Sequence, residues 1–130
     1  MPSRAKDWLR QADRDLAAAG TEFAAQHYDW ACFASQQAAE KALKGLYQHH
    51  HAEGWGHVLV RLVDEIASDE PEIVALRDKA AVLDGFYIPT RYPNGFDAGA
   101  PCDFLTEAQA RQGREYAEAI VSFCKSRCGR

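Results

Sequence analysis

Apolar residues recur at spacings of three and four along most of the chain, which is the period of an amphipathic helix. The first run covers about residues 4 to 25 and the second about residues 28 to 50. One face of the first run carries Trp8, Ala12, Leu16, Ala19 and Phe23. No segment shows the sustained alternation that is typical of a strand. The pattern therefore predicts an all-α protein.

A third apolar run begins near His57, after two glycines interrupt the second run. It is interrupted in turn at Pro71, a residue that suits the first turn of a new helix. The run then continues to Tyr87, and Pro89 ends it because proline removes a hydrogen-bond donor and restricts the residue before it. We expect a third helix that is divided into two pieces.

The segment from Pro89 to Leu105 contains three prolines and two glycines and is too long for a simple turn. Loops of this length in compact domains are often functional. A capping box at Thr106-Glu107-Ala108-Gln109 then begins the final helix. Its inward stripe is Ala110, Gly113, Ala117, Ile120, Val121 and Cys124. The whole pattern predicts an up-down four-helix bundle with an extra short helix.

Length and composition limit the classes of protein to consider. The 130 residues, 47% of them hydrophobic, are enough for one continuous core, so we expect a single domain over residues 1–130. A net charge of −4 argues against extensive binding of duplex DNA. No apolar stretch approaches the roughly 20 residues that span a bilayer, and the N-terminus lacks the apolar core of a signal peptide. We therefore expect a cytoplasmic protein without a membrane segment.

The first candidate for chemistry is Arg91, which stands near Tyr87 and next to Tyr92. A planar guanidinium suits bidentate binding of a phosphate, and aromatic rings can stack on a base. The alternative is structural: Arg91 pairs with Asp84 or Asp97, and the two tyrosines pack the loop onto the bundle. The spacing alone leaves both interpretations open.

Lys41 and Lys44 form the second candidate group, on the long second helix. They can supply positive charge to a phosphate near Arg91 if this face of the helix is turned toward the loop. The alternative is a solvated helix face, on which Glu40 and Lys44 form an ordinary i,i+4 ion pair worth a few tenths of a kcal/mol. We expect Arg91, Tyr87, Tyr92, Lys41 and Lys44 to be the residues that contact a nucleotide.

His57 is the third candidate, because its unperturbed pKa near 6.5 suits a general base. The alternative is that it orients the loop before the third helix. The cysteines do not form a paired C-x-x-C motif, although Cys124 and Cys128 share a helix face. We expect no metal and no cofactor.

Three segments, taken in order, resemble the HEPN family of small all-helical domains. They are SQQAAEKALK at residues 35–44, Gly56-His57, and Arg91-Tyr92-Pro93. The resemblance covers the chain from about Lys6 to Phe123. It implies a bundle of four or five helices that forms a homodimer. It also implies a partner, since many such proteins are encoded beside a small nucleotidyltransferase and form a toxin–antitoxin pair with it.

The resemblance also implies a mechanism to be tested. Catalytic members of the family cut RNA without a metal, using an arginine and a histidine with four to six residues between them. Arg91 matches the arginine, but Phe96, Asp97 and Ala98 stand where the histidine is sought, and none of them is a histidine that could transfer the proton. We therefore expect binding of a nucleotide or RNA and of a protein partner, rather than catalysis. The alternatives are an RNase toxin with an altered site, using Arg91 and His57, and a purely structural scaffold.

Overall fold

Three long helices form the body of the structure, a computed structural model that describes residues 3–87 and 91–129. They are α1 (Ala5–Ala24), α2 (Tyr28–His49) and α6 (Glu107–Cys128). The shorter elements are α3 (Leu59–Ile66), the 3₁₀ segment η1 (Pro71–Leu76), α4 (Arg77–Asp84), the 3₁₀ segment η2 (Pro93–Gly95) and α5 (Pro101–Phe104).

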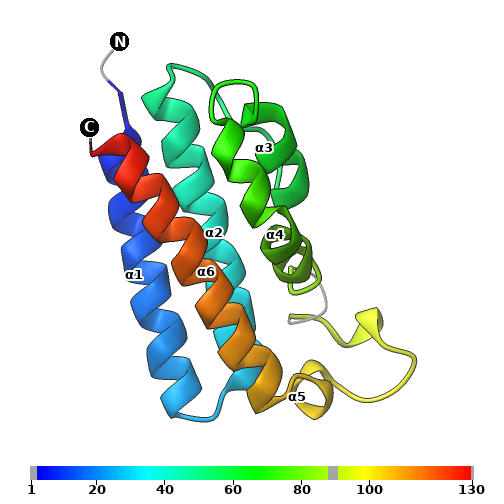
Figure 1. The fold of residues 1–130 in the computed structure, drawn as a ribbon. Coiled ribbons are helices and arrows are strands. Elements are labelled where there is room, and N and C mark those ends of the chain that lie inside the picture. The colour runs from blue at the N-terminus through cyan, green and yellow to red at the C-terminus, as the bar shows by residue number, and fades with distance from the viewer. Residues whose placement is uncertain (1–2, 88–90, 130) are drawn as a thin grey trace.

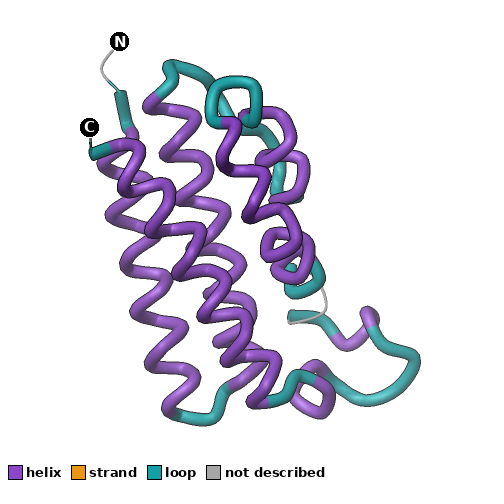
Figure 2. The backbone as a smooth tube through the Cα atoms, in the orientation of Figure 1, coloured by secondary structure: helices purple, strands orange, loops and turns teal. Residues whose placement is uncertain are grey.

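The long helices lie side by side, and α3 and α4 pack along the same body on the far side of α2 from α1 (Figure 1). The described ends of the chain, near α1 and α6, lie together at one end of the bundle. Figure 2 shows only helices and loops over residues 3–87 and 91–129. The predicted all-α bundle is confirmed, and so is the division of the third helix, which is split into α3 and the η1–α4 pair.

Helix α2 occupies the centre because small residues allow its neighbours to approach closely. Ala38, Ala39 and Ala42 are fully buried along it. At Gly45 an added Cβ would lie 3.2 Å from side-chain atoms of both Trp8 and Leu9, so α1 packs directly against the backbone of α2 there. The close approach fixes the register between α1 and α2, which decides the side chains that meet across them.

The final helix begins as the sequence predicts. The Thr106 hydroxyl accepts a hydrogen bond from the Gln109 N–H (3.2 Å), and the Gln109 side chain accepts one from the Thr106 N–H (2.9 Å). All six residues of the predicted inward stripe are buried. In the part of the chain that the structure describes, no helix is long and apolar enough to cross a membrane.

The segment between α4 and α6 is more ordered than its composition predicts, since it contains η2 and α5. The predicted stop at Pro89 lies outside the described residues, and α4 already ends at Asp84. The turns that follow are tight, with the Phe86 N–H bonded to the Leu83 carbonyl at 3.0 Å. Beyond this end of the helix, Tyr87 is turned toward α2, where it contacts the ring of Phe33.

Candidate functional site

The guanidinium of Arg91 contacts three aromatic rings. Its guanidinium carbon is 4.7 Å from the ring centre of Phe33, 4.7 Å from that of Tyr87 and 5.1 Å from that of Tyr92. Its Nε–H donates a hydrogen bond to the Tyr87 carbonyl at 3.1 Å. Ring faces attract a cation without neutralising it. The loop therefore presents an arginine whose orientation is fixed by neutral groups.

Neither aspartate considered as a structural partner pairs with this arginine. Among residues 3–87 and 91–129, no carboxylate forms an ion pair with Arg91. Asp84 instead caps α3, accepting hydrogen bonds from the Leu59 N–H at 2.6 Å and the Val60 N–H at 3.1 Å. The ion-pair interpretation of Arg91 from sequence is therefore wrong, and the half-buried Asp84 carboxylate is bonded to the N-terminus of α3 instead.

Burial also changes the charge behaviour of Asp84. Loss of hydration raises its pKa above the ordinary value. The hydrogen bonds from the Leu59 and Val60 amides lower the pKa and offset part of this rise, while the nearby charge of Glu40 adds to it. Asp84 is thus a structural carboxylate that holds the α3 end of the site.

His57 reaches the same place from the loop before α3. Its imidazole stacks on the ring of Tyr87, with 4.8 Å between ring centres and 16° between planes. Its Nδ1 lies 3.0 Å from both carboxylate oxygens of Glu40. The structure therefore brings together Arg91, Tyr87 and His57, although they come from three different segments. The hydrogen bond at Nδ1 sets the direction of the ring and leaves Nε2 as the outer nitrogen.

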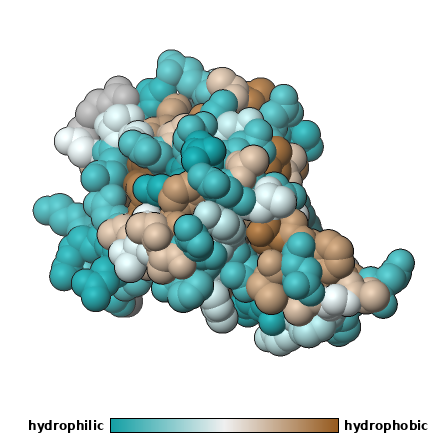
Figure 3. All heavy atoms as spheres, turned by 90° about the horizontal axis from the view of Figure 1, so that it is seen from below, coloured by the Kyte–Doolittle hydropathy of each residue, from teal (hydrophilic) through white to brown (hydrophobic). Residues whose placement is uncertain are grey.

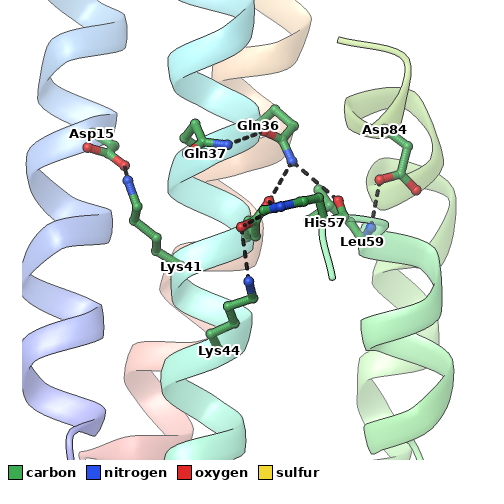
Figure 4. Close-up of polar contacts among 9 residues, drawn as sticks. Asp15, Gln36, Gln37, Lys41, Lys44, His57, Leu59 and Asp84 are labelled. Carbon is green, nitrogen blue, oxygen red and sulfur yellow. Dashed lines mark hydrogen bonds and ion pairs between the residues drawn. The ribbon is translucent and has the colours of Figure 1, made fainter. Parts of the chain in front are cut away.

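Glu40 is the anchor of this arrangement. Glu40 is only 4% exposed, although a solvated helix face is one interpretation of its place in the sequence. Besides His57, it accepts from Lys44 Nζ at 3.2 Å and from Gln36 Nε2 at 3.2 Å (Figure 4). The predicted i,i+4 pair exists, but it is buried. The alternative of a solvated helix face is therefore wrong for Glu40, because the loop before α3 covers this side of α2.

The two lysines do not accompany Arg91. Lys41 points to the other side of α2, where its Nζ pairs with Asp15 of α1 at 2.5 Å (Figure 4). Lys44 forms an ion pair with Glu40, and its Nζ lies 6.0 Å from the ring centre of Trp8. Of the five residues expected to contact a nucleotide, the structure groups Arg91 with Tyr87 and Tyr92, and it places both lysines in ion pairs with carboxylates, Lys41 with Asp15 and Lys44 with Glu40.

Phe33 and Gln36 belong to the site but are not among the predicted residues. Phe33 supports Arg91, and Gln36 contacts both Glu40 and the His57 carbonyl, the latter at 3.5 Å. A signal for them exists in the sequence, since positions 33, 36, 40 and 44 fall on one face of a helix. That face carries an aromatic ring, an amide, a carboxylate and an ammonium, which is an unusual set for a buried stripe.

The described residues contain no group of three His, Cys, Asp or Glu side chains arranged to hold a metal ion. The four cysteines are free thiols. Burial raises the pKa of Cys32 to about 12, and it raises the pKa of Cys124 still further. These two thiols are therefore core residues, which agrees with the buried place predicted for Cys32.

The chain is similar in sequence and fold to known helical domains. The model of the HEPN domain matches residues 5–127. TT1696 from Thermus thermophilus is 40% identical, with a TM-score of 0.90 over 96% of this chain and 98% of that chain. ST0689, described as an archaeal HEPN homologue, is 36% identical, with a TM-score of 0.80 over 98% of this chain and 99% of that one.

A HEPN domain protein from Thermotoga maritima is 31% identical, with a TM-score of 0.77 over 95% of this chain and 98% of that chain. No curated protein matches the sequence. The similar structures are covered almost from end to end, so the described fold corresponds to their whole chains and not to a fragment of them.

Proposed function

The chain belongs to the HEPN domain family, and on that premise we propose that it is a nucleotide- or RNA-phosphate-binding and partner-binding module centred on Arg91. The observation that carries the proposal is the guanidinium on three aromatic rings, without a carboxylate partner among the described residues. Arg91 binds the phosphate, and the ring of Tyr92, which is 48% exposed, lies beside it and contacts the nucleotide. Lys41 and Lys44 contribute only if binding releases them from Asp15 and Glu40.

The same proposal includes protein partners. We expect a cytoplasmic homodimer that associates with a small nucleotidyltransferase in a toxin–antitoxin-type pair. The support is family membership alone. Co-expression with a small nucleotidyltransferase encoded beside this chain, followed by size-exclusion chromatography with light scattering, tests both contacts. A monomer that never co-elutes with that enzyme would contradict this part of the proposal.

Calorimetric titration with 5′-AMP tests the binding site. The wild type should bind saturably, and Arg91→Ala should weaken binding by about tenfold or more, the loss of a charge-assisted phosphate contact. Arg10→Ala is the matched control, because it removes the same charge from an exposed position on α1. Equal binding by all three proteins would contradict the proposal, and no binding by any of them would favour a scaffold.

A second candidate function is metal-independent RNA cleavage, and the contact between His57 and Glu40 favours it. A carboxylate that fixes an imidazole beside an arginine is the arrangement expected of a general base next to a phosphate-stabilising group. In this reaction His57 takes the proton of a ribose 2′-hydroxyl. The 2′-oxygen then attacks phosphorus to form a 2′,3′-cyclic phosphate, while the leaving 5′-oxygen takes a proton from the imidazolium.

RNA cleavage in EDTA separates the two functions. If the protein is an RNase, both Arg91→Ala and His57→Gln should abolish cleavage. The control His51→Asn should retain activity, since His51 is exposed and asparagine tolerates its positive φ of 57°. If the protein only binds, no variant and no wild-type sample will cleave, and the AMP titration alone will respond to Arg91.

A further inference from the structure

A groove between α1 and α2 shares one wall residue, Phe33, with the Arg91 site. Its volume is about 310 Å³. The walls come from both helices: Asp15 and Glu22 of α1, Trp30, Phe33, Gln37 and Lys41 of α2, and one alanine from each helix. The two alanines leave room for a flat group. The groove opens near the end of the bundle where α2 begins, and Figure 3 shows apolar side chains exposed among polar ones at this end.

Phe33 is a wall of this groove and also part of the Arg91 site. Its ring meets the Trp30 ring edge to face, with 6.2 Å between ring centres. The centre of the Phe33 ring also lies 6.3 Å from that of Tyr87 and 4.7 Å from the guanidinium carbon of Arg91. The aromatic surface is therefore continuous from the groove to the arginine. A ligand whose planar and anionic parts lie on either side of the Phe33 ring can touch both places.

Besides Lys41, whose ammonium is bonded to Asp15, the polar groups that line the groove are the carboxylates Asp15 and Glu22 and the amide of Gln37. Asp15 is held by Lys41 at 2.5 Å, and Glu22 contacts the exposed His27 through one oxygen at 2.8 Å. The Gln37 amide donates through its NH₂ to Gln36 at 2.8 Å, so its carbonyl oxygen is the remaining acceptor. A planar ligand with N–H donors on its edge therefore suits this groove better than one with carbonyls there.

We propose that the groove holds the base of the nucleotide whose phosphate Arg91 binds, with a preference for bases that carry an exocyclic amino group. The inference rests on the proposed function, because Arg91 supplies the anchor for the phosphate. The base stacks on the half-exposed Trp30 ring, with the perpendicular Phe33 ring at its edge, while Glu22 and Gln37 accept its amino hydrogens. A cationic side chain would also suit aromatic walls, but it would be repelled by Arg91 and by Lys41, which lines the groove.

Cytidine and uridine monophosphates provide the sharpest test, since their bases differ at the exocyclic amino group and the adjacent ring nitrogen. Calorimetry should show that CMP binds about tenfold more tightly than ribose 5-phosphate, because base stacking adds to the phosphate contact. CMP should also bind more tightly than UMP, by about threefold or more, because the exocyclic amino group adds a hydrogen bond to a carboxylate. The wild type, Trp30→Ala and Glu22→Gln are each titrated with all three ligands.

Each variant should remove one part of the recognition. Trp30 is half exposed, so Trp30→Ala should fold and should bring CMP close to the affinity of ribose 5-phosphate. Glu22→Gln should reduce the difference between CMP and UMP while leaving ribose 5-phosphate unchanged. Glu118→Gln, an exposed substitution on α6, is the matched control and should behave as the wild type.

The outcomes distinguish this inference from the one it rests on. If the three ligands bind alike to the wild type and to Trp30→Ala, while Arg91→Ala weakens all of them, the groove does not bind the base and the phosphate site remains. If none of the ligands binds the wild type, both inferences are wrong. Loss of base preference in Trp30→Ala with phosphate binding retained is the result that the groove predicts.

Discussion

The imidazole of His57 lies flat against the ring of Tyr87, with 4.8 Å between their centres. Two loops that are separated by α3, η1 and α4 are thereby joined on the surface of α2. The Tyr87 carbonyl accepts a hydrogen bond from Arg91, and the Glu40 carboxylate holds the His57 ring through its Nδ1. The arginine and the buried Glu40 carboxylate are thus linked through Tyr87 and His57, and substitutions can test this arrangement.

Glu40→Gln should lower the free energy of unfolding by about 1–2 kcal/mol. The substitution keeps the shape of the side chain but removes the charge that pairs with Lys44 and His57 in a buried place. Urea denaturation measures the change. Glu118→Gln on the exposed face of α6 should change stability by less than about 0.5 kcal/mol. Equal stability of the two variants would show that the Glu40 contacts do not hold the fold.

Arg91→Lys should weaken binding of 5′-AMP by about tenfold, or about 1.4 kcal/mol, despite the retained charge. Lysine lacks the planar fork that lies over Phe33, Tyr87 and Tyr92 and that binds a phosphate with two parallel hydrogen bonds. Calorimetry gives the affinity, and circular dichroism confirms the helical content. Full affinity in the lysine variant would mean that only the charge matters at this position.

The stability of the wild type relative to Asp84→Asn should fall as the pH rises. Burial raises the pKa of Asp84 in the folded state above its ordinary value of 3.8, so the folded protein keeps a proton that the unfolded chain has lost. The protonated carboxyl therefore contributes fully to stability below the unfolded pKa of about 3.8. That contribution is lost as the pH rises through the higher pKa of the folded state. Urea denaturation of both proteins at about pH 4 and about pH 7 measures the difference, and an unchanged difference would contradict a raised pKa.

Thiol labelling should follow burial. Cys102 is exposed and should react first with iodoacetamide at about pH 8. Cys32, with a pKa raised to about 12 by burial, should stay unmodified until the protein unfolds, and the buried Cys124 should behave in the same way. Mass spectrometry of peptides at successive times records the order. Early labelling of Cys32 would show that the start of α2 opens readily.

Much of the fold follows from local patterns in the sequence. The capping box at Thr106 and the stripe from Ala110 to Cys124 lie where the periodicity predicts them, because helix caps and apolar faces depend on residues near in sequence. The division of the third helix is also confirmed, with Pro71 at the start of η1. The early end of α4 differs from the prediction, because the amides of Gly85, Phe86 and Tyr87 bond to carbonyls three residues back instead of four, and periodicity carries no information about this change.

The site is less accessible to sequence reasoning. Arg91 is recognisable between two tyrosines, but its partner ring Phe33 lies on another helix far earlier in the chain, and only packing joins them. The burial of Glu40 has the same cause, since the loop that carries His57 covers it. Lys41 and Lys44 are neighbours on α2, yet one pairs with α1 and the other with Glu40. Which neighbour faces each position is a tertiary property.

The central claim, that Arg91 binds phosphate, is tested most directly by NMR. The Nε–H resonance of Arg91, assigned by its loss in Arg91→Lys, is followed during titration with 5′-AMP. We predict a saturable shift of this resonance, together with shifts of the backbone amides of Tyr87 and His57, which contact it or its supporting ring. Saturable shifts elsewhere on the protein, with the Arg91 resonance unmoved, would contradict the claim.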